Sequence, residues 1–307
     1  MRYLMLTAAL AAPVVVVHSE REASAERFLE QQGQGQNPSQ LPLSLGLREK
    51  GSSLTGAFEG WYHDKDGSIR VLVGYMNRNT KQEFDIPIGP NNRIEPGGPD
   101  QGQPTHFQSG RQWGVFTIKL PKDFGDKKLT WTLVANGFNN TITLHTKPEY
   151  IVEPFEDAAS KNTPPVIKFE PNGKPVTGPP SVIAASMTAT VGKALALDAW
   201  VTDEGPKVNP IPAIPGFEPP PPGVKWSVFR SPASGTTGGG VKIDPPNPKI
   251  DKATGKVTTN VTFAAPGEYI LRMQANDSTG EGGGGFQCCW TNAHVKVTVG
   301  SGSTAGL

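Results

Sequence analysis

One segment constrains the fold of this chain more than any other, the run from Pro266 to Gly280. It opens with a Pro-Gly turn and closes with an Asp-x-x-Gly turn. Between the turns, apolar and polar side chains alternate, with one side made of Tyr269, Leu271, Met273 and Ala275 and the other of Arg272, Gln274 and Asn276. A period of two is typical of a strand with one buried face. The run is therefore predicted to be a half-buried β-strand.

Similar short runs recur along the chain between turn residues. The 307 residues include 36 glycines and 30 prolines, and only 36% are hydrophobic, which favours short strands and many turns over helices. A chain of this length can bury two separate cores. Turns that recur at short intervals between strands are typical of β-sandwiches. The predicted strands are 57–62, 69–76, 82–88, 114–120, 129–135, 141–146, 187–191, 195–201, 224–229, 257–263, 269–275 and 293–299.

Two aromatic residues indicate the kind of sandwich. Tyr269 follows a turn at the start of the predicted penultimate strand, where an immunoglobulin-like domain places a tyrosine whose hydroxyl bonds back to the backbone. Trp226 lies in the middle of the predicted strand 224–229, as expected of a core tryptophan between two sheets. The sequence thus favours an immunoglobulin-like sandwich over its last part.

These residues also carry a family resemblance. Leu195-Ala196-Leu197-Asp198, Trp226-Ser227 and Pro266-Gly267-Glu268-Tyr269, with Asp277 and Gly280, resemble PKD and cadherin-like immunoglobulin-fold domains of bacterial surface proteins. The resemblance covers about the last 120 residues and implies adhesion or binding only loosely, because this fold hosts many functions. The calcium-binding Asp-x-Asn-Asp run of cadherins is absent, so calcium is not expected to stiffen the linker. Residues 54–150 resemble no family.

The chain divides into six predicted parts. The predicted fold class is all-β, with two immunoglobulin-like antiparallel β-sandwiches joined by a Pro-rich linker and preceded by a signal or anchor segment. The linker is expected to be semi-rigid because of its prolines. The parts are a signal peptide or retained anchor at 1–25, a short helix and linker at 26–53, the first sandwich at 54–153, the linker at 154–180, the PKD/immunoglobulin-like sandwich at 181–299 and a tail at 300–307.

The N-terminus predicts export. Arg2, an apolar run over 4–17 and the triplet Ala23-Ser24-Ala25 follow the order of a secretory signal. Charges at 20–22 interrupt the segment before the predicted cleavage site, so a retained membrane or complex anchor stays open as an alternative. The expected location is the periplasm or the cell surface, with membrane contact only through the N-terminal segment if it is retained.

The charge balance disfavours nucleic-acid partners. The 29 basic residues nearly match the 28 acidic ones, and no basic stripe or acidic block stands out. The five histidines are scattered, and neither His-Glu-x-x-His nor Gly-x-Ser-x-Gly occurs. The sequence therefore offers no catalytic residues, no cofactor and no metal site, and the chain is not expected to be an enzyme.

The cysteines are adjacent, at 288 and 289. In an oxidising compartment they are expected to form a vicinal disulfide or to lie buried, with an intermolecular bond or a metal contact involving His294 as the alternative. The glycine run 280–285 places Phe286, Cys288, Cys289 and Trp290 at the end of a sandwich, where loops commonly bind partners. The alternative is that Phe286 and Trp290 fold back and cap the core.

A second candidate contact group is His106, Arg111 and Trp113. An imidazole beside a guanidinium can bind a carboxylate, although in a loop it more often makes local hydrogen bonds. Asp64-Lys65-Asp66-Gly67 has the first spacing of a calcium loop but lacks its downstream glutamate, so a hairpin turn is the better interpretation. Asp203 and Asp277 could meet and bind a cation, with solvated turn carboxylates as the alternative.

The functional expectation is reached by exclusion. The chain is predicted to be a non-catalytic exported accessory or scaffolding subunit that contacts other envelope proteins of a bacterial membrane complex at its extracytoplasmic face. The first alternative is a carbohydrate- or surface-binding module in which Trp61, Tyr62 and Trp113 stack on sugar rings. The second is a secreted enzyme with a site built from loops.

Overall fold

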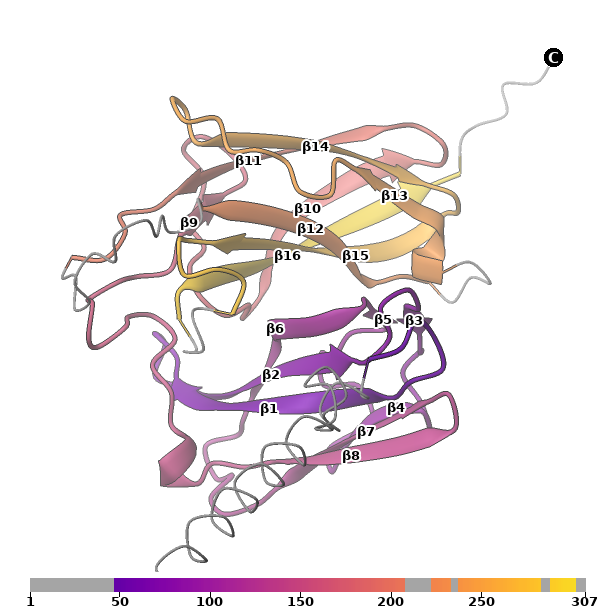
Figure 1. Cartoon of the computed structure of the whole chain (residues 1–307), viewed down its shortest axis with the longest axis vertical. Coiled ribbons are helices and arrows are strands. Elements are labelled where there is room, and N and C mark those ends of the chain that lie inside the picture. Colours follow the sequence, from indigo (N-terminus) through magenta and orange to yellow (C-terminus); the bar gives the residue numbers. More distant parts are fainter. Residues whose placement is uncertain (1–46, 208–221, 233–236, 283–287, 302–307) are drawn as a thin grey trace, which may run out of the picture. The chain divides into compact units, whose positions relative to one another are not determined.

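β-strands form nearly all the regular structure of this chain. The computed structural model describes residues 47–207, 222–232, 237–282 and 288–301, and Figure 1 labels their strands. Within these ranges the helical segments are short 3₁₀ turns, among them η3 (Pro148–Tyr150) and η4 (Thr237–Gly240). None of the described helices has the length and apolar character that a membrane crossing requires. The all-β prediction is confirmed.

The first sandwich has two three-stranded antiparallel sheets. The strand order is β1-β2-β6 in one sheet and β4-β7-β8 in the other, and β3 pairs with β5 beside them (Figure 1). Asp64 N donates to Ser68 O across the β1–β2 turn, so the predicted hairpin is confirmed. The strands are β1 (Leu54–His63), β2 (Ile69–Asn77), β3 (Phe84–Asp85), β4 (Asn92–Glu95), β5 (His106–Phe107), β6 (Gly110–Lys119), β7 (Leu129–Ala135) and β8 (Phe138–Leu144).

The second sandwich has two four-stranded sheets. Their orders are β10-β16-β15-β12 and β13-β14-β11-β9, and every described pair is antiparallel except β10 with β16 (Figure 1). The strands are β9 (Val166–Lys168), β10 (Ile183–Thr190), β11 (Leu195–Thr202), β12 (Gly223–Arg230), β13 (Val241–Asp244), β14 (Lys256–Phe263), β15 (Gly267–Asn276) and β16 (Trp290–Gly300).

This strand order is that of an immunoglobulin-like domain. Across one sheet, β9, β11, β14 and β13 correspond to strands A, B, E and D, and in the other sheet β12, β15 and β16 correspond to C, F and G. Trp226 on β12 is 1% exposed and lies in the core between the sheets. The hydroxyl of Tyr269 donates to the carbonyl oxygen of Ala265 at 2.9 Å. Both aromatic predictions are therefore confirmed.

The prediction that β15 is half-buried is wrong. Its apolar residues fill the core of the second sandwich, but Arg272 and Gln274 on the opposite face are each only 3% exposed. The guanidinium of Arg272 reaches residues of β6, so the polar face of β15 is covered as well. The alternation with a period of two predicted the strand correctly, but it did not predict that the polar face of the strand is covered too.

The predicted linker contributes a strand to a sheet. Residues 166–168 form β9, which pairs with β11, and Ile167 is completely buried. Leu47–Leu307 form one compact unit, so the division into two domains stays a prediction. The predictions on the signal or anchor segment and the helix that follows it lie outside the described residues, as do those on most of the Pro-rich insertion 206–222 and of the tail.

The hydrogen bond of Tyr269 gives a first test of the fold. Substituting Tyr269→Phe removes the hydroxyl but keeps the ring, so the free energy of unfolding should fall by about 1 kcal/mol. Urea unfolding measures this as a lower midpoint with an unchanged slope. Tyr150→Phe, at a residue that is 47% exposed, is the matched control and should change the midpoint little. Equal effects of the two substitutions would contradict the assignment.

Candidate functional site

An exposed aromatic cluster forms where β1, the segment after β8 and η3 meet. The ring centroids of Phe58 and His145 lie 4.6 Å apart, those of His145 and Tyr150 4.8 Å, and those of Phe58 and Tyr150 5.6 Å. Ile151 follows Tyr150, and these two residues are 52% and 47% exposed. We call Phe58, His145, Tyr150 and Ile151 the aromatic cluster. Three rings in contact with one another, next to an exposed isoleucine in the chain, make this a candidate contact site.

The backbone beneath the aromatic cluster is fixed to β1. The indole Nε1 of Trp61 donates to Lys147 O at 2.7 Å, and Val152 N donates to Trp61 O at 2.9 Å. Gly60 has a φ of 113°, and a Cβ at this position would lie 2.7 Å from Tyr150 O. Only glycine therefore lets the segment with Tyr150 lie this close to β1. The aromatic cluster is thus held in place before any partner binds.

The aromatic cluster is uncharged at neutral pH. Partial burial, followed by the charge of Lys147, lowers the pKa of His145 below its usual value. The imidazole is therefore mainly neutral at pH 7 and behaves as a third aromatic ring.

A buried arginine is the centre of a polar network between β6, β15 and β16. The Nε of Arg272 donates to Asn292 Oδ1 at 2.8 Å, its Nη1 to Gln112 Oε1 at 3.0 Å and its Nη2 to Trp113 O at 3.1 Å. Asn292 Nδ2 in turn donates to Gly114 O at 3.0 Å. Each nitrogen of this guanidinium thus has an acceptor inside the chain, which is what a buried cation requires.

Arg111 and Trp113, two predicted partner-binding residues, flank this network. Arg111 forms an ion pair with Glu59, whose side chain is 1% exposed and also accepts from Gly114 N at 2.8 Å. Burial raises the pKa of Glu59, an effect opposed by the charge of Arg111. The guanidinium carbon of Arg111 lies 3.9 Å from the ring centroid of Trp113. Both residues thus have partners within the chain, and their role toward another protein stays a prediction.

Trp290 is packed inside the chain. It is 1% exposed and clusters with Tyr62 and Leu72 of the first sandwich. A Cβ at Gly114 would lie 1.9 Å from its ring, so only glycine fits at that position. For Trp290 the structure agrees with the alternative in which the side chain folds back, whereas Phe286 lies outside the described residues.

Cys288 and Cys289 form a vicinal disulfide, so the first interpretation of the pair is confirmed. The two residues are 4% and 1% exposed. His294, the other suggested metal ligand, makes a hydrogen bond from Nε2 to Val115 O at 3.1 Å, and burial lowers its pKa to about 3. The imidazole is therefore neutral, and it stacks on Phe229. The role of the two cysteines toward a partner stays a prediction.

His106 is buried between two carboxylates. Its Nδ1 lies 2.9 Å from Asp85 Oδ1 and its Nε2 3.3 Å from Glu83 Oε2. Burial lowers the pKa of His106, but the hydrogen bonds and charges of Asp85 and Glu83 outweigh it and raise the pKa to about 9. Gly238 N donates to Asp85 Oδ2 at 2.7 Å. His106 is therefore a buried imidazolium that helps to fix the residues around η4.

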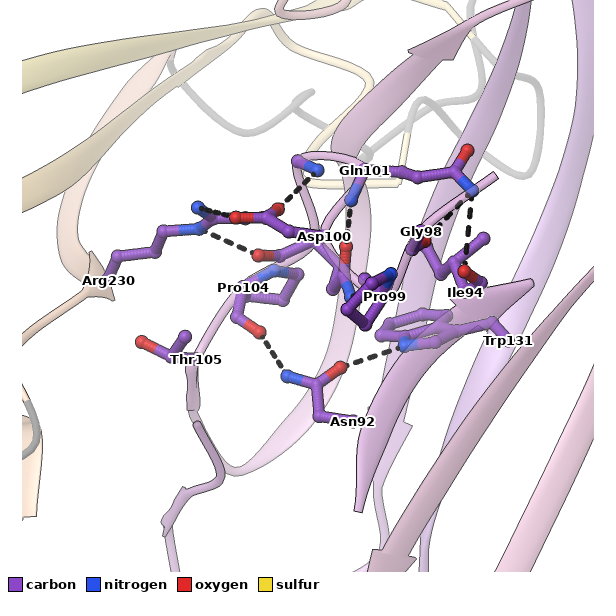
Figure 2. A network of polar contacts seen from close by, with 12 residues as sticks. Asn92, Ile94, Gly98, Pro99, Asp100, Gln101, Pro104, Thr105, Trp131 and Arg230 are labelled. Carbon is purple, nitrogen blue, oxygen red and sulfur yellow. Dashed lines mark hydrogen bonds and ion pairs between the residues drawn. The ribbon is translucent and has the colours of Figure 1, made fainter. Parts of the chain in front are cut away.

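The loop after β4 is held by polar contacts within the chain. The side-chain amide of Asn92 donates to Pro104 O at 2.7 Å and accepts from Trp131 Nε1 at 3.0 Å (Figure 2). Arg230 from β12 forms an ion pair with Asp100 at 2.7 Å (Figure 2). It also donates to Gln103 O at 2.8 Å. The loop is therefore fixed by contacts with β7 and β12.

The carboxylates at the two suggested cation sites accept hydrogen bonds from the chain itself. In the β1–β2 turn, Ser68 N donates to Asp66 Oδ1 at 2.9 Å, so the hairpin interpretation is confirmed. Asp277 is completely buried and accepts from Thr279 N at 2.8 Å and from Asn162 Nδ2. It is therefore not a solvated turn carboxylate. Within the described ranges, no group of three or more His, Cys, Asp or Glu side chains is placed to hold a metal.

The aromatics proposed for sugar binding are largely covered. Trp61 is 8% exposed and Tyr62 is 1% exposed, while Trp113 lies under Arg111 and against Gly282. Tyr150 of the aromatic cluster is one of the exposed rings, and no local pattern in the sequence indicates this cluster. Its members stand at positions 58, 145 and 150–151, and only the meeting of β1 with η3 brings them together.

Comparisons with known proteins give no family for this chain. No family model matches it, and no curated protein matches it. Solved structures with some likeness include the titin M3 domain, 16% identical over 38% of this chain and 88% of that domain, with a TM-score of 0.21. Domains 4 and 5 of the S-layer protein SbsC are 11% identical over 81% of this chain and 98% of that one, with a TM-score of 0.22.

The D00-D0 domain of intimin is 12% identical over 81% of this chain and all of that one, with a TM-score of 0.24. Scores this low carry no argument about function. The immunoglobulin-like assignment of the second sandwich therefore rests on its strand order and on Tyr269 and Trp226.

The raised pKa of His106 predicts a pH-dependent stability. Because the folded pKa of about 9 lies above the unfolded value, the imidazolium stabilises the fold fully below about pH 6.5. This contribution, on the order of 3 kcal/mol, is lost as the pH rises through about 9. His106→Gln should therefore cost much of the stability at pH 6 and little at pH 10, as measured by urea unfolding.

The control for this prediction is His63→Gln, at an exposed histidine beside Trp61. It should change the free energy of unfolding little, because the side chain is exposed. A pH-independent effect of His106→Gln would show that the imidazole is not a buried cation.

Proposed function

We propose that this chain is a non-catalytic, exported accessory subunit that contacts other proteins at the extracytoplasmic face of a bacterial membrane complex. The aromatic cluster is the contact surface. The order of basic, apolar and small residues at the N-terminus supports export. The resemblance of the last part to PKD and cadherin-like domains of bacterial surface proteins supports the bacterial setting.

This proposal rests on a contrast in exposure: three titratable side chains are buried, whereas part of the aromatic cluster is exposed. Glu59, Arg272 and His106 are buried and paired within the chain, so their charges serve the fold. Tyr150 and Ile151, in contrast, leave about half of their surface in water. Tyrosine supplies a large contact area at low conformational cost, and aromatic residues are enriched in protein interfaces.

The direct test is purification of the protein from native membranes under mild detergent. The wild-type chain should bring down one or more partners in stoichiometric amounts. Tyr150→Ala should weaken this association by about 2 kcal/mol, or roughly thirtyfold, because the ring supplies most of the aromatic contact area. Quantitative mass spectrometry of the eluted proteins measures the loss.

A matched control is Phe138→Ala, which removes another ring that is 50% exposed but does not belong to the aromatic cluster. It should leave the recovery of partners unchanged. Recovery of the chain alone would contradict the proposal. Micromolar binding to a glycan array that Tyr150→Ala abolishes would instead favour the carbohydrate-binding alternative.

A further inference from the structure

The edge strand β10 lacks the charged side chains and prolines that commonly protect a sheet edge. β10 is the outermost strand of its sheet and pairs only with β16. None of its residues is buried, Ile183 is 41% exposed, and the preceding Val182 is 67% exposed. In the described part of the chain, no segment other than β16 hydrogen-bonds to the backbone of residues 183–189. Its outer N–H and C=O groups are therefore available to another strand.

The composition of β10 also favours pairing with another strand. Residues 181–191 contain no charged side chain and no proline. β12, the strand at the opposite edge of the same sheet, carries Lys225 and Arg230. β13, an edge strand of the other sheet, carries Lys242 and Asp244. Charged residues on an edge strand oppose pairing with a further chain. β10 is thus open to pairing, whereas charged side chains protect β12, the other long edge strand.

We propose that β10 is a dimerisation edge that pairs antiparallel with β10 of a second copy of this chain. The evidence for a second copy is that the strand complements itself. In the register centred on Met187, Ala185 lies opposite Ala189 of the other copy, and Met187 lies opposite Met187. On the other face, Ser186 lies opposite Thr188. Within residues 185–189, apolar residues thus meet apolar residues and hydroxyl residues meet hydroxyl residues, with no charge opposed.

A two-fold axis through Met187 would make each contact twice, as in a closed symmetric dimer. The small side chains at 184–186 allow the two backbones to approach. The β-bulge between Ile183 and Ala185 limits the regular ladder to residues 185–189. The pairing is therefore short, and the dimer should depend on concentration. This inference goes beyond the proposed function, because the aromatic cluster takes no part in it.

Sedimentation equilibrium of the purified full chain tests the pairing. The wild type should shift with concentration from the monomer mass of 32.7 kDa toward twice that value. The double variant Ser186→Lys with Thr188→Lys places lysine opposite lysine and should weaken self-association at least tenfold. Ser186→Glu with Thr188→Glu should do the same. Mixing the two double variants places lysine opposite glutamate and should restore the dimer.

Ser186 and Thr188 lie on a strand with no buried residue, so these variants should fold, and circular dichroism at matched concentration confirms it. Ser186→Lys alone is a milder second variant that should weaken the dimer in the same direction. A wild-type chain that stays monomeric at the highest concentration would overturn the proposal. A dimer that all three variants leave unchanged would overturn it too, because it would use another surface. Neither result bears on partner recovery through Tyr150, so the two proposals fail independently.

Discussion

The buried guanidinium of Arg272 is the interaction on which the rest of the structure depends. A cation can leave water only if its donors find acceptors, and Arg272 finds them on Gln112, Trp113 and Asn292. Two of these acceptors belong to β6 and the third to β16. The second face of β15 can therefore be covered only while β6 supplies its part of the network. A buried arginine that lost these partners would destabilise the fold by several kcal/mol.

This arrangement decides which residues are left for function. Glu59 balances Arg111, His106 lies between two carboxylates, and the loop after β4 is held by Asn92 and Arg230. Polar groups that are fully satisfied inside a protein specify its fold. Among the large hydrophobic side chains, Tyr150 and Ile151 stay about half exposed, and Val182 and Ile183 are exposed at the start of β10. Contact with other proteins is the function that such surfaces support.

Period-two alternation and turn residues made much of the fold predictable. The long strands, the β1–β2 hairpin, the core position of Trp226 and the hydrogen bond of Tyr269 all follow from local sequence. The short strands β4, β5, β9 and β13 were not predicted, because two to four residues are too few to show a period. Their pairing is decided by the neighbouring strands.

The contact surface could not be predicted in the same way. Arg272 stands on the polar side of an alternating strand, and nothing in its neighbourhood in sequence indicates that β6 covers it. The aromatic cluster likewise combines residues of three distant segments, and Gly60 signals the close approach only once η3 is known to lie there. Conversely, His106, Arg111 and Trp113 stand out in sequence because the fold uses them internally.

Calorimetric unfolding of the full chain tests most directly whether the Arg272 network joins the two sandwiches into one unit. Because β15 and β6 share the buried guanidinium, unfolding of the first sandwich removes two acceptors of Arg272, and unfolding of the second removes the donor to Gln112 and Trp113. Heating should therefore give a single transition whose calorimetric enthalpy equals the van't Hoff enthalpy. Two separate transitions, with a calorimetric enthalpy well above the van't Hoff value of each, would show that the sandwiches unfold independently and would contradict this assignment.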